Sequence, residues 1–495
     1  MNIVPSYIHN FDEILEGGFS KPSVVLVAGV AGSGKTTFAT QSLFNAARSG
    51  ETCLFISTLS EPPAMINSYM SRFSFFDQKL YETKKMNIIS ISEDLLKLGH
   101  DAVIEFINKK ISLLKPARIV IDPVTGLSDV LESFRDKSKT GDEMRGFYFD
   151  LFTSLKSWNT LVLITGEFIL EDLRKSMVSY LADGIIYLSE EPVGMLVERN
   201  IRILKMRGQK YISGKHTFDI RDDGITVFPR LLPLAWVEKP VSLVRVSTGI
   251  HSLDTMLKGG ILEDDVLLIA GTTGTGKTTF GLYFIWDGLL KGENALIISM
   301  EKRPSKLVRN AKTFGMELDP YLNKKKLEVC YVSPVSYHPN EEALKLKRKI
   351  SQNHVKRILF DGIENLEASI PDNMERKNYI TVLLDIFSTL GVTTAVTSEI
   401  SDLFGTVRLT HEALADAVDT IILLRHVEIE GKIHGVLSIL KSRGIEHDRE
   451  IREFEITEKG VNIKSSMKGY ENVLSGTARK TAVDIFKETF GEKQI

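Results

Sequence analysis

The amino-acid sequence predicts an α/β protein of two tandem domains. Each domain should have a mainly parallel sheet, helices on both faces of that sheet, and antiparallel hairpins at its C-terminal end. Three observations lead to this fold class. The chain repeats its own motifs in a constant order, short apolar runs alternate with segments of helical periodicity, and each repeat holds the same glycine-rich loop. A chain of 495 residues is long enough for two such domains.

The internal repeat sets the domain boundaries. A shift of 242 residues takes Asp12 to Asp254 and also takes residues 29–36 onto residues 271–278. Later landmarks keep the same order with small drifts in the shift, which indicate loop insertions. We therefore expect a first domain at residues 1–230, a linker at 231–246, a second domain at 247–463 and a C-terminal tail at 464–495.

The strands are predicted from runs that are apolar on both faces, as in a parallel sheet covered by helices. In the first domain these runs are residues 24–28, 53–56, 119–121 and 161–164. Further along, residues 211–228 alternate in polarity around a turn signal, and residues 448–463 do the same in the second domain. These two segments predict the antiparallel hairpins.

The linker and the tail have no counterpart in the repeat. Residues 229–240 are rich in proline, which predicts a short extended connection between the domains. Residues 482–490 of the tail carry a helix-like apolar stripe that fits docking on this chain or on a partner.

Composition narrows the class of function. The chain has 62 Lys and Arg against 64 Asp and Glu, so its net charge of −2 gives no general attraction for nucleic acid or anionic lipid. Cys53 and Cys330 lie in apolar, strand-like runs, which predicts buried thiols in a reducing compartment. No apolar run reaches the length of a membrane span, and the N-terminus lacks the charged region of a signal peptide. We expect a cytoplasmic protein.

The glycine-rich loop has the pattern G-x-x-x-x-G-K-[ST], and each copy stands between a buried strand and a helix. This context identifies a phosphate-binding loop, in which backbone N–H groups surround the β-phosphate and the lysine neutralises phosphate oxygens. The candidate nucleotide-binding residues of the first loop are Gly29, Gly32, Ser33, Gly34, Lys35, Thr36 and Thr37. Those of the second loop are Gly271, Thr273, Gly274, Thr275, Gly276, Lys277, Thr278 and Thr279.

Asp122 and Asp361 each end an apolar strand, where the second acidic motif of phosphate-loop proteins holds magnesium. The hydroxyls of Thr36 and Thr278 are the other candidate magnesium ligands. No Asn-Lys-x-Asp motif, which reads guanine, is present. The sequence therefore predicts ATP with Mg²⁺ as the cofactors.

A catalytic base must lie near the γ-phosphate to orient water. Glu301 follows the next apolar strand of the second domain, and we expect it near the loop if neighbouring strands adjoin. In the first domain Leu59 takes that position, and the nearest acid is Glu61. The first site therefore either uses Glu61 or hydrolyses slowly.

Four segments together resemble the KaiC family, whose members have two RecA-like lobes and act as ATPases and autokinases. The segments are residues 247–254, 271–278, 301–315 and 441–454, and residues 470–476 are similar to the C-terminal segment of that family. The resemblance implies hexameric rings with ATP between subunits. It also implies that certain side chains reach the phosphate bound by the neighbouring subunit, namely Lys205, Arg207, Lys441, Arg443 and His447.

The sequence also departs from the family pattern. The family has paired glutamates after the strand of each lobe, whereas this chain has Glu301 followed by Lys302 in the second domain. The autophosphorylated Ser-Thr pair is replaced by Ala415 and Asp416, so the phosphorylation cycle of the clock protein cannot use those positions. Thr410 is the one remaining candidate phosphoacceptor in that segment.

The leading hypothesis is a ring-forming, KaiC-like ATPase that acts as a nucleotide-dependent switch read by a signalling partner. Two alternatives stay open. One is a Ser/Thr autokinase or protein kinase, and the other is a nucleotide-gated ring that binds DNA. Basic clusters at residues 324–326 and 345–349 are interleaved with glutamates and lack an aromatic series, which favours a solvated helix face over a nucleic-acid site.

Overall fold

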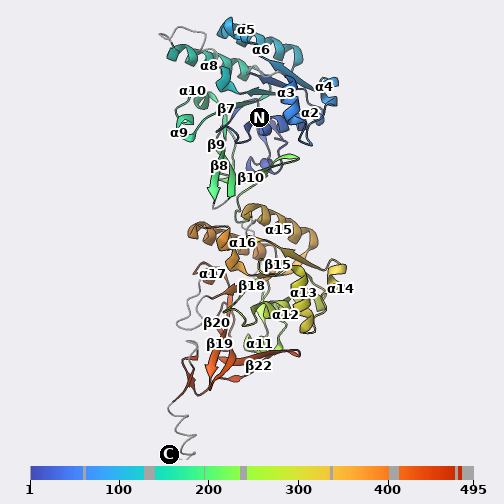
Figure 1. Ribbon diagram of the computed structural model, residues 1–495, viewed down its shortest axis with the longest axis vertical. Helices are drawn as coiled ribbons and strands as arrows, with labels where there is room; N and C mark the ends of the chain where they lie inside the picture. Colours follow the sequence, from blue (N-terminus) through green and yellow to red (C-terminus); the bar gives the residue numbers. More distant parts are fainter. Residues whose placement is uncertain are drawn as a thin grey trace, which may run out of the picture. The chain divides into compact units, whose positions relative to one another are not determined.

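The structure of the protein is a computed structural model. It describes residues 2–58, 63–127, 140–193, 196–234, 242–334, 338–400, 412–473 and 478–481. The chain divides into two compact units, Met1–Arg230 and Leu231–Ile495. In its described part, each unit contains a nine-stranded mixed sheet with helices around it (Figure 1).

The sheet of the first unit has the strand order β11-β10-β9-β8-β3-β7-β6-β4-β5. The strands from β8 to β5 run parallel, and β9, β10 and β11 continue the sheet as antiparallel strands. The strand bounds are β3 (Ser23–Gly29), β4 (Cys53–Ser57), β5 (Met86–Ser90), β6 (Arg118–Asp122), β7 (Leu161–Glu167), β8 (Gly184–Val193), β9 (Leu196–Met206), β10 (His216–Arg221) and β11 (Gly224–Phe228). A separate ribbon joins β1 (Asn2–Val4) to β2 (Phe19–Lys21).

Helices cover both faces of this sheet. Successive side chains of β3 point to opposite faces and pack against different helices. Val25 and Val27 belong to the cluster that includes α2, whereas Val24 and Leu26 belong to the cluster that includes α6 and α8. The helix bounds are α1 (Phe11–Ile14), α2 (Lys35–Arg48), α3 (Pro63–Met70), α4 (Lys79–Glu82), α5 (Glu93–Lys97), α6 (His100–Leu114), α8 (Thr140–Lys156), α9 (Leu170–Leu173) and α10 (Met177–Leu181).

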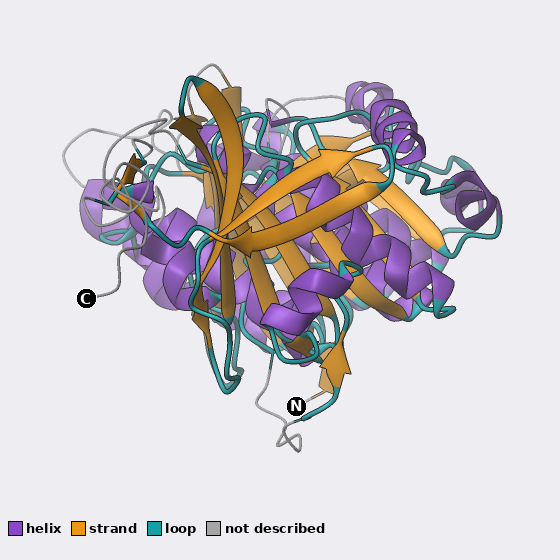
Figure 2. Ribbon diagram, turned by 90° about the horizontal axis from the view of Figure 1, so that it is seen from below, coloured by secondary structure: helices purple, strands orange, loops and turns teal. Residues whose placement is uncertain are grey.

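The second unit repeats this topology with the strand order β16-β15-β17-β18-β14-β19-β20-β21-β22. Its strands are β14 (Val266–Gly271), β15 (Asn294–Ser299), β16 (Leu327–Tyr331), β17 (Val355–Asp361), β18 (Thr393–Glu399), β19 (Thr420–Ile429), β20 (Lys432–Ser442), β21 (Arg452–Thr457) and β22 (Gly460–Ser466). Its helices are α11 (His251–Met256), α12 (Lys277–Leu290), α13 (Pro304–Thr313), α14 (Asp319–Asn323), α15 (Pro339–Asn353), α16 (Asn373–Thr389), α17 (Glu412–Ala417) and the 3-10 helix η2 (Ile363–Ala368). Figure 2 shows the helices of the chain in purple and its strands in orange. Two short ribbons pair β12 (Arg245–Val246) with β13 (Ile261–Leu262) and β23 (Tyr470–Glu471) with β24 (Arg479–Lys480).

A buried arginine links the sheet of the first unit to its N-terminal segment. Arg118, at the start of β6, is 1% exposed. Its Nε donates to Glu51 Oε2 at 2.8 Å, and its guanidinium lies 4.8 Å from the ring centroid of Tyr7. Arg357 has the same position in the second unit and pairs with Glu293 at 2.6 Å. The repeat therefore includes an ion pair around a buried arginine. Removing one partner of a buried ion pair strongly destabilises a protein.

The α/β class, the parallel sheets and both C-terminal hairpins are confirmed. The prediction for Cys330 is wrong, because this residue is half-buried on the edge strand β16, whereas Cys53 is buried as expected. The apolar stripe at residues 482–490 lies outside the described residues. Among the described helices, none combines the length and hydrophobicity that a membrane span requires.

Candidate nucleotide-binding sites

Each phosphate loop connects the central strand of a sheet to a long helix. In the first unit β3 ends at Gly29 and α2 begins at Lys35, and in the second β14 ends at Gly271 and α12 begins at Lys277. The N-termini of both helices therefore face the loop, where backbone N–H groups and the helix dipole favour a bound anion.

The hairpins predicted at the end of each unit pack against these loops. Gly276 has φ +92°, and a Cβ there would lie 2.2 Å from Ile456 Cδ1 on β21. Gly34 has φ +95°, and a Cβ there would lie 3.0 Å from Ile220 Cδ1 on β10. Glycine is needed at Gly276 both for the left-handed backbone and for the close approach of the hairpin.

The two loop lysines are held by carbonyl oxygens of their own loops. Lys35 is 7% exposed, and its Nζ donates to Val30 O at 2.7 Å. Lys277 Nζ donates to Gly271 O and to Thr272 O, both at 3.0 Å. Burial lowers the pKa of both lysines, and nearby carboxylates partly offset that effect. Each ammonium is thus aimed along the loop that should receive phosphate.

Asp361 lies at the end of β17 beside the second loop and is 0% exposed. Its Oδ1 accepts hydrogen bonds from Thr278 Oγ1 at 3.0 Å and Thr397 Oγ1 at 2.9 Å. Its Oδ2 is buried and has no partner among the described residues. Burial raises the pKa of this carboxyl, while the nearby Lys302 ammonium lowers it.

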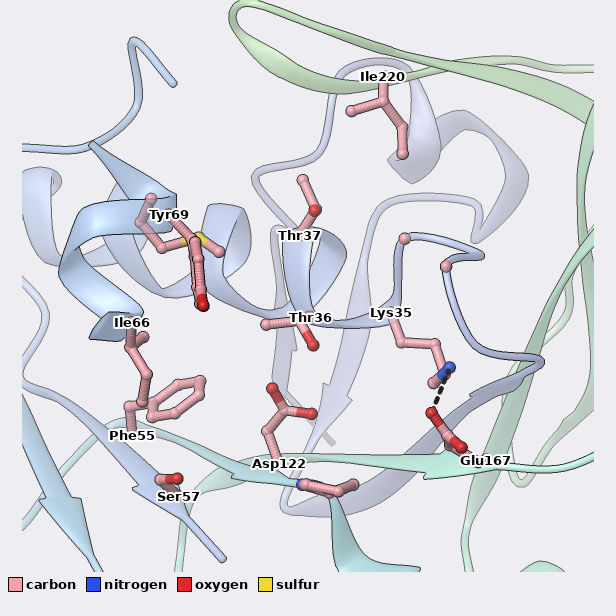
Figure 3. A pocket seen from close by; sticks show the side chains of 14 residues that line it. Lys35, Thr36, Thr37, Phe55, Ser57, Ile66, Tyr69, Asp122, Glu167 and Ile220 are labelled. Atoms are coloured by element: carbon pink, nitrogen blue, oxygen red, sulfur yellow. Dashed lines mark ion pairs between the residues drawn. The ribbon is translucent and has the colours of Figure 1, made fainter. Parts of the chain in front are cut away.

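This combination of one carboxylate and one hydroxyl fits Mg²⁺, which binds few protein oxygens and shares its remaining positions with water and phosphate. The described residues contain no group of three or more His, Cys, Asp or Glu that would form an all-protein metal cage. In the first unit the side chains of Thr36 and Asp122 also point toward each other (Figure 3). Asp122 also accepts a hydrogen bond from Thr165 Oγ1.

A cavity of about 620 Å³ opens over the first phosphate loop (Figure 3). This volume falls within the range of small-molecule sites. Its lining combines the predicted loop residues with side chains from β4, α3, β6, β7 and β10, namely Gly32, Gly34, Lys35, Thr36, Thr37, Phe55, Ser57, Ile66, Tyr69, Met70, Asp122, Pro123, Glu167 and Ile220.

The condition on which the prediction for Glu301 depended is not met. The strand before Glu301, β15, does not adjoin β14, because β17 and β18 lie between them in the sheet. Glu301 still approaches the site, since a Cβ on Gly362 would lie 3.5 Å from Glu301 Cβ and Gly362 directly follows Asp361. Its carboxylate lies 3.6 Å from Lys302 Nζ. Glu61 lies outside the described residues.

Three further carboxylates lie near the loop lysines and were not predicted. Glu167 pairs with Gly29 across β7 and β3, and its Oε1 lies 4.0 Å from Lys35 Nζ. Glu399 has the same place in the second unit and accepts from Thr273 Oγ1. Glu364 accepts from the Glu399 N–H at 3.2 Å, and burial raises its pKa. The repeated Thr-x-Glu pattern at residues 165–167 and 397–399 could have revealed the first two.

The cations expected to act on phosphate lie at the other end of each sheet. Met206, between Lys205 and Arg207, pairs with Gly184 at the start of β8, whereas Leu188 of the same strand pairs with Gly29 at the loop. Four residues of strand separate the two positions, or about 13 Å along the sheet. The structure therefore does not bring these cations to the loop of their own unit.

The second unit shows the same separation. Lys441 and Ser442 pair with the first residues of β19, whereas Gly271 pairs with Leu424 farther along that strand. Lys441 Nζ donates to Ala415 O and Val418 O, both at 2.7 Å. His447 follows in the next turn, and its buried Nδ1 has no partner among the described residues.

In both units the phosphate-loop strand is separated by one strand from the strand that ends in the candidate magnesium aspartate. This arrangement and the two loops define a tandem RecA-like protein of the phosphate-loop class. Residues 4–231 and 246–468 match the KaiC ATPase family. The chain therefore belongs to the KaiC family, which confirms the resemblance seen in the sequence.

Several relatives match over almost the full chain. The circadian clock oscillator protein KaiC of Parathermosynechococcus lividus is 31% identical over 489 residues, which cover 96% of this chain and 88% of the relative. The proteins of the same name from Thermostichus vulcanus and Synechococcus elongatus are each 30% identical, over 97% and 96% of this chain and 92% of each relative.

Proposed function

We propose that this chain is an ATPase that assembles into rings, hydrolyses ATP at the interfaces between subunits and acts as a nucleotide-dependent switch. The observation that carries the proposal is the distance between each phosphate loop and the cations at the far end of the same sheet. A cation that cannot reach its own loop can contact a phosphate only if another subunit brings that phosphate to it. Hydrolysis would then depend on assembly.

Within one subunit, the loop residues bind the phosphates, and Lys35 and Lys277 neutralise the β- and γ-oxygens. Thr278 and Asp361 would hold Mg²⁺ in the second site, and Thr36 and Asp122 would hold it in the first. When bound, Mg²⁺ neutralises charge that develops on the phosphate oxygens.

Glu301 orients the attacking water in the second site, since it follows β15 and lies beside Asp361. The cations of the neighbouring subunit, Lys441 and Arg443, stabilise the charge on the transferring phosphoryl group. Lys205 and Arg207 do the same in the first site. The carbonyls that Lys205 and Lys441 contact belong to the ends of short helices, and these contacts keep both cations at the subunit surface.

A mixing experiment tests the interface directly. Two proteins are made in a Lys35→Met background, which removes the first site. One also carries Lys277→Met and lacks the second loop lysine. The other also carries Lys441→Met and lacks the cation that should act on the neighbouring subunit. Each protein alone should be inactive. Random mixed rings should recover about one quarter of the sites, because each active site needs one intact loop and one intact neighbour.

Lys347→Met serves as the matched control, because Lys347 is an exposed lysine on α15 far from either motif in the sequence. It should leave hydrolysis unchanged. Full activity of Lys441→Met alone, or no recovery in mixed rings, would contradict hydrolysis at subunit interfaces.

The kinase alternative differs in where the γ-phosphate goes. Described residues of α17 support hydrolysis to free phosphate, because Ala415 and Asp416 have no hydroxyl to accept it. Thr410 lies outside the described residues. Incubation with γ-labelled ATP separates the two activities: release of all label as free phosphate supports the ATPase, and label retained on the protein supports the kinase.

The basic clusters support a protein partner over nucleic acid. Lys345 Nζ lies 3.0 Å from Glu341 and 2.7 Å from Glu342, and Lys349 contacts Glu328. These lysines are already neutralised by glutamates. We expect no binding to single-stranded DNA at low salt, where electrostatic binding would be strongest.

We place the activity in the cytoplasm, because Cys53 and Cys330 are both free thiols. The tail beyond residue 464 is our candidate surface for a signalling partner that reads the nucleotide state. Deletion of residues 482–495 should leave hydrolysis intact and abolish capture of that partner.

A further inference from the structure

A lysine lies where the second site should hold its metal ion. Lys302 Nζ donates to Thr278 Oγ1 at 3.0 Å, and its charge is the largest of those that lower the pKa of Asp361. Thr278 and Asp361 are the hydroxyl and the carboxylate that fit Mg²⁺. The ammonium therefore faces both candidate magnesium ligands of this site.

The backbone around Lys302 fixes it in this position. The Lys302 N–H donates to Ser299 Oγ at 3.0 Å, and Ser299 pairs with Asp361 across β15 and β17. The Met300 N–H donates to Asp361 O at 3.1 Å. The side chain of Lys302 is 29% exposed, so it is partly covered and remains connected to solvent.

We propose that the Lys302 ammonium is a built-in cation of the second nucleotide site, which lets this site hold the triphosphate of ATP without Mg²⁺. The inference rests on the proposed ATP binding by this site. An ammonium supplies one positive charge and three donors to phosphate oxygens, although at longer distances than the 2.0–2.1 Å typical of Mg²⁺. Magnesium and Lys302 would then compete for the same oxygens.

Glu301 is a second partner of Lys302. Its Oε1 lies 3.6 Å from Lys302 Nζ, so the ammonium that contacts Thr278 also pairs with Glu301 while Mg²⁺ is absent. In the magnesium-free state the lysine neutralises the carboxylate that we assign to water orientation. The second site would therefore store ATP without magnesium and hydrolyse it once magnesium displaces the lysine.

The first site is a natural comparison within the same chain. At the shift of 242 residues that relates the two phosphate loops, Lys302 corresponds to Ser60, which carries no charge. Both units have the same loop motif and a threonine and an aspartate as candidate magnesium ligands. Only the second site should therefore bind ATP in the absence of divalent metal.

The test measures equilibrium binding of a fluorescent ATP analogue in Mg²⁺ and in EDTA. Lys35→Met isolates the second site, and Lys277→Met isolates the first. We expect EDTA to weaken binding by less than about threefold at the second site and by more than about tenfold at the first.

Two substitutions in the Lys35→Met background assign the effect to the charge. Lys302→Met removes the charge at similar length, and it should lower affinity in EDTA by about tenfold or more while leaving affinity in Mg²⁺ nearly unchanged. Lys302→Arg keeps the charge and should retain binding in EDTA. Lys302→Met should also lower the Mg²⁺ concentration needed for half-maximal hydrolysis, because this variant lacks the competing ammonium.

The outcomes separate this inference from the proposed function. Equal loss of binding in EDTA at both sites would overturn the inference, and so would Lys302→Met and Lys302→Arg proteins that behave alike. Failure of both isolated sites to bind the analogue even with Mg²⁺ would instead overturn the proposed function. Thermal melting followed by circular dichroism checks that each variant is folded.

Discussion

Replacing Asp361 by Asn should make the nucleotide-free second unit more stable while it abolishes hydrolysis at the second site. Asp361 is 0% exposed, and one of its two oxygens has no partner among the described residues. An ionised carboxylate in such a place is expensive, and burial accordingly raises its pKa. We attribute the retention of this costly group to its proposed role in metal binding.

The magnitude follows from the contacts. Asn can still accept the hydrogen bonds from Thr278 and Thr397 through its carbonyl oxygen, so those bonds survive. Removing the buried charge gains several kcal/mol, while the new buried NH₂ donor costs about 1–3 kcal/mol and the lost attraction of the nearby Lys302 ammonium offsets part of the remainder. We expect a net gain of about 1–2 kcal/mol, which raises Tm by roughly 2–4 °C per kcal/mol for a unit of this size.

The stability difference between the wild type and Asp361→Asn should depend on pH. Because the pKa of Asp361 is raised, the native state holds this proton more tightly than the unfolded chain does, and the cost of the charge disappears as the pH falls below that pKa. The Tm advantage of Asp361→Asn should therefore be largest above the raised pKa and should shrink as the medium is acidified.

Differential scanning calorimetry without nucleotide measures this difference. Asp122→Asn is the matched control in the first unit, where the aspartate is only half-buried, and it should change Tm much less. A lower Tm for Asp361→Asn at alkaline pH, or a difference that does not change with pH, would refute the reasoning.

Three further predictions concern the rest of the molecule. Burial raises the pKa of Asp265 to about 7. Wild-type stability relative to Asp265→Asn should therefore fall as the pH rises through that value, as measured by urea unfolding at several pH values. Arg118→Leu removes the buried partner of Glu51, whose own side chain is 25% exposed, and should destabilise the first unit by about 1.5–3 kcal/mol in the same assay, with the second unit unchanged. Gly276→Ala places a Cβ 2.2 Å from Ile456 Cδ1 and should weaken nucleotide binding at the second site by about tenfold or more, as measured by titration calorimetry.

Much of the fold could be predicted from local sequence patterns. The apolar runs and the loop motif predict β3, α2 and their counterparts, because these elements depend on residues close together in the chain. Strand order depends on tertiary packing, which no local pattern encodes. For that reason the sequence left open whether β15 adjoins β14, and in the structure β17 and β18 lie between them.

The candidate site was predicted only in part. Lys277, Thr278 and Asp361 stand in motifs of fixed spacing, and the structure brings them together. Glu364 escaped notice because its place depends on how η2 follows β17. In the sequence Lys302 is only a departure from the paired glutamates of the family. Its contact with Thr278 in the structure is what indicates a role.

The solution mass of the active species tests the central claim most directly. Size-exclusion chromatography with light scattering, run with and without ATP and Mg²⁺ and combined with hydrolysis assays of each fraction, provides this measurement. We predict that hydrolysis is confined to a ring with a mass about six times the 55.5 kDa of one chain. Hydrolysis at full rate by a species of 55.5 kDa would contradict the assignment of trans-acting cations.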